Sequence, residues 1–149
     1  FTPVPFKLGD NQEVKYIIKP CVGNISYQIP ETPSDNFLRE NMQYYLSEND
    51  ACFEFFIQLR KDNMSLDKAR IEWKEKDSPY IKVAKLIIPK QNFNIPEIDM
   101  SCEDETFFPY NTLKKNKPVG NMNRARFVVY QKFSALRMKY NNKEPKIIY

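Results

Sequence analysis

Apolar and polar side chains alternate along three stretches of the chain, and this period of two predicts β-strands at residues 13–20, 52–60 and 81–89. The second stretch shows the clearest alternation, because aromatic and branched side chains dominate it. One face is expected to carry Phe53, Phe55, Ile57 and Leu59, and the other Glu54, Gln58 and Arg60. A shorter run at 69–73 predicts a further strand, with Ile71 and Trp73 directed inward.

Two stretches have helical periodicity instead. The first begins near Ser34 or Asp35, each of which can cap a helix, and closes over residues 47–50. Its apolar stripe is expected to comprise Phe37, Leu38, Met42, Tyr45 and Leu46. The second covers residues 121–142, with Asn121 or Asn123 as its N-cap. Strands and helices together predict an α+β fold.

The segment between the last strand and the last helix, residues 91–119, carries prolines at 96, 109 and 118 and is expected to be irregular. A loop of this length is uncommon in a compact domain unless it lines a site or wraps a partner. We expect one domain over residues 1–142, followed by a polar tail at 143–149.

Composition removes several kinds of site. The 149 residues include no histidine, which excludes a His general base, a Ser–His or Cys–His dyad and a His metal ligand on this chain. Three glycines and no Gly-rich phosphate motif disfavour a Walker or Rossmann nucleotide site. No apolar run is long enough to span a membrane.

Cys21, Cys52 and Cys102 are odd in number and widely spaced, and no C-x-x-C pair exists. These features predict reduced thiols and a cytoplasmic protein.

Charge is concentrated near the C-terminus. The formal net charge is +4, but residues 111–149 contain ten Lys or Arg and a single acid, Glu144. With the aromatic strand 53–56, this basic region could form a nucleic-acid surface. We favour a core strand beside a solvated cationic helix, because Phe53 and Phe55 alternate as core residues do and the lysines are dispersed. Nucleic acid is therefore not expected as a partner.

Arg126, Tyr130 and Arg137 share one face of the predicted last helix, at azimuths of 0°, about 40° and about 20°. A guanidinium beside a phenol favours the phenolate, which is an anionic ligand suited to ferric iron. The second arginine could hold a carboxylate with two parallel hydrogen bonds. The alternative for such an arginine–tyrosine pair is a cation–π or packing contact on a solvated helix face.

Three blocks carry a family resemblance: FEFFIQLRKDN (53–63), LDKARIEWKEKDSPYIKVAKLIIPKQNF (66–93) and FFPYNTLKKNKPVGNMNRARFVVY (107–130). GDNQEVKYIIKP (9–20) fits the strand before them. In order and spacing, the chain resembles the catalase superfamily, and most closely its small catalase-related haem peroxidase branch. The resemblance covers about residues 1–140 and implies part of an antiparallel β-barrel with flanking helices, including a C-terminal helix on the proximal side of the haem.

The resemblance also implies roles for single residues. Tyr130 falls at the position of the proximal tyrosinate that binds haem iron, and Arg126 at that of the arginine that hydrogen-bonds its oxygen. Arg137 matches an arginine that larger catalases place close behind the ligand, where it can meet a haem propionate. The branch usually has histidines near the positions of Asn111 and Asn116, and this chain has neither.

The distal half of a catalase site, with its histidine base, lies upstream of the matched blocks, so no catalytic base is expected on this chain. The resemblance implies a peroxide-using haem protein when that half is present, acting on hydrogen peroxide or an organic hydroperoxide. The chain alone is expected to be weakly active or inactive. The alternative is a truncated, non-enzymatic catalase-like fold that acts as a binding module. The exposed strand edges of a partial barrel predict self-association into homo-oligomers or aggregates.

Overall fold

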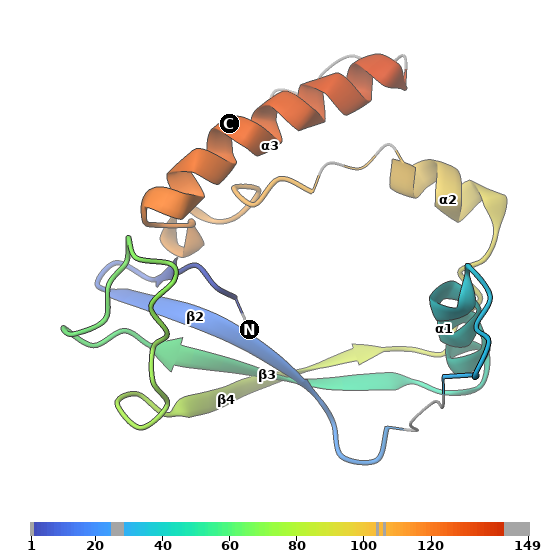
Figure 1. The fold of residues 1–149 in the computed structure, drawn as a ribbon, viewed down its shortest axis with the longest axis horizontal. Helices are drawn as coiled ribbons and strands as arrows, with labels where there is room; N and C mark the ends of the chain where they lie inside the picture. Colours follow the sequence, from blue (N-terminus) through green and yellow to red (C-terminus); the bar gives the residue numbers. More distant parts are fainter. Residues whose placement is uncertain (1, 25–28, 104, 106, 142–149) are drawn as a thin grey trace. The chain divides into compact units, whose positions relative to one another are not determined.

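The fold begins with a hairpin of β1 (Phe6–Leu8) and β2 (Gln12–Pro20) (Figure 1). We describe it from a computed structural model that covers residues 2–24, 29–103, 105 and 107–141. The two strands are antiparallel, with Phe6 opposite Val14. Gly9 begins the connection with a positive φ of 73°, which glycine adopts without steric cost. The prediction of a strand at 13–20 is confirmed, whereas the three-residue β1 was not predicted.

The sheet continues with β3 (Ala51–Leu59) and β4 (Tyr80–Ile88), which confirm the strands predicted at 52–60 and 81–89. The four strands are antiparallel and follow the order β1-β2-β3-β4, and in the described part of the chain they form an open sheet. Strand β4 lies at one edge, and most of its residues are exposed on both faces. The α+β fold is thus confirmed, and the described residues form an open antiparallel sheet that does not close into a barrel.

The expected faces of β3 are only partly correct. Gln58 was placed on a polar face, but its side chain is 2% exposed. Its amide nitrogen donates to the carbonyls of Trp73 and Ser78, at 2.8 and 3.0 Å. A buried polar side chain is tolerated when its hydrogen bonds are made, so these two carbonyls explain its position.

No strand forms over residues 69–73, and that prediction is wrong. The segment is a turn followed by irregular backbone, in which Trp73 is buried as expected and Ile71 is half exposed. The Trp73 carbonyl accepts from the Gln58 side chain, and the indole N–H donates to the carbonyl of Ser65 at 3.2 Å. Side chains and loop backbone therefore supply the bonds that a neighbouring strand would otherwise make.

The segment 91–119 contains regular structure that the prolines concealed. Helix α2 (Pro96–Glu103) begins at a proline, and the short 3-10 helix η1 (Lys114–Asn116) follows later. Proline is well tolerated at the first position of a helix, where its missing N–H would have no helical partner. The expectation of an irregular segment is therefore only partly correct.

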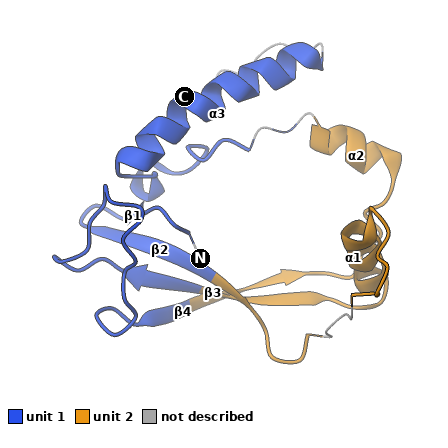
Figure 2. Ribbon diagram, in the orientation of Figure 1, with its two compact units in different colours: residues 1–17, 56–82, 104–149 blue, residues 18–55, 83–103 orange. Residues whose placement is uncertain are grey.

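The chain divides into two compact units (Figure 2). The first comprises Phe1–Ile17, Phe56–Lys82 and Asp104–Tyr149, and the second Ile18–Phe55 and Val83–Glu103. Most of the buried apolar side chains belong to the first unit. They are Val4, Val14, Ile17, Ile57, Met64, Trp73, Phe108 and Met138.

The second unit contains α1 (Phe37–Glu48) and α2, which are joined by an ion pair of Arg39 with Asp99 at 2.9 Å. Helix α1 is confirmed, but Asn36 rather than Ser34 or Asp35 is its N-cap, and of the expected apolar stripe only Leu46 is buried. The described residues between the gap at 25–28 and α1 are not in a helix or strand.

Cys21 and Cys52 form a disulfide within the second unit, with Cα atoms 5.3 Å apart. This corrects the prediction of reduced thiols for these two residues, because β2 and β3 are neighbours in the sheet and bring the cysteines together. The amide of Cys21 also donates to the carbonyl of Cys52 at 3.0 Å. Cys102 is free and exposed.

Candidate functional site

Helix α3 (Asn121–Tyr140) carries all three predicted site residues, and its existence confirms the predicted helix up to residue 140. Residue 142, the predicted end, and the tail at 143–149 lie outside the described residues. The start of α3 is held by the backbone before it, where Lys7 and Val119 donate to the carbonyls of Lys117 and Pro5, at 2.9 and 3.1 Å. The segment leading into α3 therefore pairs with the outer edge of β1.

Gly120 is the N-cap of α3, in place of the predicted Asn121 or Asn123. Its φ of 87° and ψ of 165° lie in a region that essentially only glycine occupies. A Cβ atom here would overlap the backbone carbonyl of Leu66. The carboxylate of Asp67 accepts from the backbone N–H of Asn121 at 2.8 Å, so a distant side chain performs the capping that an asparagine was expected to perform.

Arg126 and Tyr130 are in contact, as their spacing predicted. A guanidinium nitrogen of Arg126 lies 3.5 Å from the Tyr130 hydroxyl, at the long limit of a hydrogen bond. The centre of the guanidinium is 5.1 Å from the centroid of the Tyr130 ring, which is a cation–π distance. The geometry therefore contains both interactions that the sequence left open, a contact with the oxygen and one with the ring.

Asn123 holds Arg126 from the other side, and sequence reasoning assigned it no part in the site. Its side chain is fully buried, and its carbonyl oxygen accepts from Arg126 at 3.1 Å. Its amide nitrogen donates to the carbonyls of Pro5 and Val119, both at 2.8 Å. The only signal in the sequence was the i, i+3 spacing of Asn123 and Arg126 on one helix.

Arg137 lies further along α3 and reaches the segment that precedes the helix. Its guanidinium donates to the carbonyl of Glu105 at 3.3 Å and lies 6.0 Å from the ring centroid of Phe107. Because a guanidinium has five N–H donors, this one bond leaves most of its donor capacity available. Residue 137 can therefore bind an anionic group without losing its anchor.

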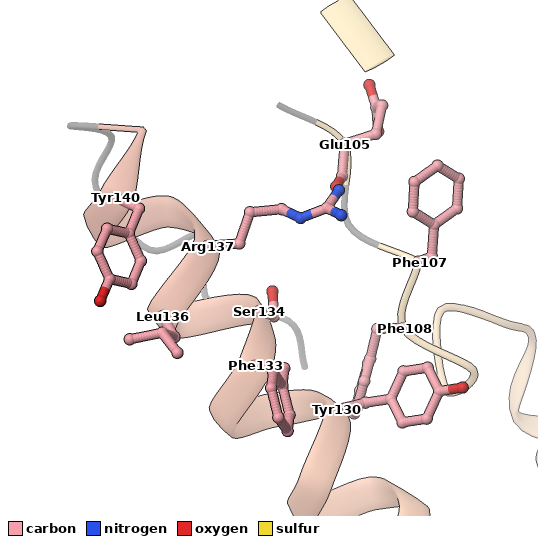
Figure 3. A pocket seen from close by; sticks show the side chains of 9 residues that line it. All are labelled: Glu105, Phe107, Phe108, Tyr130, Phe133, Ser134, Leu136, Arg137 and Tyr140. Carbon is pink, nitrogen blue, oxygen red and sulfur yellow. The ribbon is translucent and has the colours of Figure 1, made fainter. Parts of the chain in front are cut away.

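Tyr130 and Arg137 line one groove, with a volume of about 320 Å³, between α3 and residues 105, 107 and 108 (Figure 3). Its walls are mostly apolar, and Arg137 is the only cation that lines it among the described residues. The lining residues are Glu105, Phe107, Phe108, Tyr130, Phe133, Ser134, Leu136, Arg137 and Tyr140. Arg126 is not among them, so it meets the groove only through Tyr130.

An aromatic cluster fixes the segment that forms the opposite wall. The ring of Phe127 on α3 lies 5.3 Å from that of Phe108 and 4.9 Å, edge-on, from that of Tyr110. Burial raises the pKa of Tyr110, and the nearby Arg124 and Arg126 oppose this effect. Phe107 and Phe108 were expected only as part of a loop, yet two consecutive aromatic residues in such a loop are a signal that it folds back onto a surface.

The described residues contain no group of three or more His, Cys, Asp or Glu side chains placed to hold a metal ion. A metal held by this part of the chain would therefore need another donor set, such as a single phenol with a prosthetic group. None of the described helices combines the length and the apolar character that crossing a bilayer requires.

No protein-family model matches this chain, and no curated protein matches it either. Among solved structures, it is similar to a fungal catalase, with a TM-score of 0.69 and 16% sequence identity. The similarity covers 93% of this chain and 30% of the catalase chain. The chain therefore has the fold of part of a catalase, and it spans about a third of the length of that protein.

Proposed function

We propose that the chain is the proximal, haem-binding part of a catalase-related protein that uses hydrogen peroxide or an organic hydroperoxide. One observation carries the proposal: a tyrosine whose hydroxyl contacts an arginine lines an apolar groove that also contains a second arginine. The catalase-like fold supports it independently. In this proposal Tyr130 would bind the haem iron through its phenol oxygen.

The groove suits a flat, largely apolar macrocycle with carboxylate substituents. Aromatic and aliphatic side chains form most of its wall, and such surfaces are typical of cofactor sites. The phenol of Tyr130 supplies one oxygen donor, and tyrosine is the proximal haem ligand known in catalases. The guanidinium of Arg137 can form a bidentate pair with a propionate.

Arg126 acts on the oxygen of Tyr130. A cation near a phenol stabilises the ionised form, and the negative oxygen is the better ligand for ferric iron. In this proposal Arg126, whose guanidinium lies 3.5 Å from that oxygen, would hold it in place when the iron is bound. Phe107 and Phe133 line the groove with exposed rings, which would contact the apolar part of the macrocycle.

Bound haem would supply the iron at which peroxide is reduced or oxidised. Cleavage of peroxide also needs a group that moves a proton between the two oxygens. The chain contains no histidine, and we propose that the distal part of the whole protein provides this base. The present chain alone is then expected to turn over peroxide only feebly.

The proposal is tested by titrating the chain with haemin and recording visible absorption. The wild-type chain should bind haemin with a tyrosinate-type spectrum, and Tyr130→Phe should lose that spectrum. Tyr44→Phe is the matched control, because Tyr44 is an exposed tyrosine on α1 and should leave the spectrum unchanged. Identical haemin binding and spectra for wild type and Tyr130→Phe would show that the ligand assignment is wrong.

A second candidate function is a binding module without peroxide chemistry. It is favoured by strand β4, an edge strand on which Ile81, Val83, Leu86 and Ile87 are each about half exposed. Exposed apolar edges pair readily with other chains. Sedimentation of the chain with and without haemin separates the two functions: self-association in the absence of any haemin binding would favour the module.

A further inference from the structure

Asn123 is a buried polar side chain at the start of α3 whose hydrogen bonds all lead to functional or anchoring groups. It is 0% exposed, although asparagine is seldom fully buried. We propose that Asn123 is a positioning residue, which sets the guanidinium of Arg126 against Tyr130. This inference rests on the proposed role of Tyr130 as the iron ligand.

The surroundings dictate which way the amide faces. Two backbone carbonyls, those of Pro5 and Val119, lie 2.8 Å from one end of the side chain, and carbonyls only accept. The NH₂ group must therefore face them. The remaining oxygen then faces Arg126, 3.1 Å away, and can only accept from a donor such as a guanidinium. Each polar atom of Asn123 thus has one possible use.

The consequence for Arg126 is a loss of freedom. A long arginine on a helix surface samples many rotamers, and fixing it costs conformational entropy. One guanidinium nitrogen is held by Asn123, and the other lies at 3.5 Å from the Tyr130 oxygen. Because Asn123 is itself tied to two backbone carbonyls, Arg126 is oriented before any ligand binds, and little further ordering is needed when iron binds.

Groups that orient a metal ligand from behind typically contribute 10–100-fold to metal affinity. We therefore expect Asn123→Leu, which removes every hydrogen bond at similar volume, to weaken haemin binding about tenfold. Asn121→Leu is the control from the same helical turn, since the Asn121 side chain is exposed and the hydrogen bonds of Arg126 are made with Asn123 and Tyr130 instead. It should leave haemin affinity unchanged.

A double-mutant cycle separates positioning from general support. In an Arg126→Gln background, Asn123→Leu should cause no further loss of haemin affinity, because the residue through which it acts is gone. An equal loss in both backgrounds would overturn the inference. Asn123→Asp supplies a second test should the leucine variant fail to fold. Its carboxylate still accepts from Arg126, so the tyrosinate-type spectrum should remain even though stability falls; loss of that spectrum would also contradict positioning.

A haem-free measurement keeps this inference distinguishable from the proposed function. In a chain with ¹⁵N-labelled arginine, the guanidinium signals of Arg126 should be resolved and slow to exchange, and they should become averaged in Asn123→Leu. Unchanged Arg126 signals would refute positioning whatever the haem result. If Tyr130→Phe binds haemin as wild type does, the ligand assignment fails, and the Arg126 signals still decide whether Asn123 orients that side chain.

Discussion

The disulfide between Cys21 and Cys52 is expected to be a major source of stability for this chain. It joins residue 21, just after β2, to the second residue of β3, and it closes a loop with a sequence separation of 31. A cross-link stabilises chiefly by restricting the unfolded chain, and for this loop length the chain-entropy relation gives about 3.7 kcal/mol at 25 °C. Total stabilities are usually about 5–15 kcal/mol, so the effect should be large.

Backbone and side-chain hydrogen bonds beside the disulfide support the assumption behind this chain-entropy value, which is that the folded state changes little when the bridge is lost. The Cys21 amide donates to the Cys52 carbonyl at 3.0 Å, and the Asn24 side chain donates to the same carbonyl at 2.8 Å. These hydrogen bonds remain when the sulfur atoms are separated, so the strands should keep their pairing. Loss of the bridge should therefore act mainly on the unfolded state.

The assay is urea denaturation of wild type and Cys52→Ser, with and without a thiol reductant. Reduction should lower the free energy of unfolding of wild type by about 3–4 kcal/mol and should leave Cys52→Ser unchanged. Cys102→Ser is the matched control, because Cys102 is free and exposed and its loss should have no effect. Coincident curves for oxidised and reduced wild type would refute the entropic argument.

Further predictions concern a backbone position, a buried charge and the haem carboxylates. Gly120→Ala should lower the free energy of unfolding by at least 2 kcal/mol, about 1–2 kcal/mol from the positive φ and the rest from overlap with the Leu66 carbonyl. In Gly9→Ala, where a Cβ meets nothing within 4 Å, only the conformational cost should appear in the same urea titration. Burial lowers the pKa of Lys15 below its usual 10.5, so as pH rises the folded state releases this proton at a lower pH than the unfolded state does. The free energy of unfolding of wild type should therefore increase relative to that of Lys15→Met as pH rises toward 10.5. A stability difference between these two proteins that stays constant from pH 7 to 10.5 would contradict that desolvation. Arg137→Gln should weaken binding of haemin but not of its dimethyl ester, which lacks carboxylate charge, and equal losses for both would exclude a propionate contact.

The disulfide also bears on an expectation drawn from composition. A cytoplasmic setting was inferred from cysteines assumed to be reduced, and disulfides are typical of oxidising compartments. The pairing of Cys21 with Cys52 removes that basis, while the location itself stays a prediction.

Local periodicity determined much of this protein. Alternation over runs of eight or nine residues correctly predicted β2, β3 and β4, because a strand that packs on one face must repeat every second residue. The spacing of Arg126 and Tyr130 predicted their contact, since residues four apart on a helix are neighbours whatever surrounds them. Both properties depend only on backbone geometry.

The errors arose where a distant segment decided the outcome. Residues 69–73 resemble a strand, but the Trp73 carbonyl bonds to Gln58 rather than to a neighbouring strand. Pro96 looked like a breaker and instead begins α2. In each case the same residue fits two local conformations, and local preference is too weak to choose between them.

Only the tertiary structure decided how the candidate site is supported. Asparagine is a residue type that commonly caps helices, and Asn123 lies near the start of α3. The N-cap is nevertheless Gly120, and Asp67 makes the capping hydrogen bond. Asn123 is buried because Pro5, 118 residues away in sequence, supplies a carbonyl beside it. The sequence thus determined which side chains lie along the face of α3, whereas contacts across the fold determined which of them are held in place, because a hydrogen-bond partner so remote leaves no periodic signal.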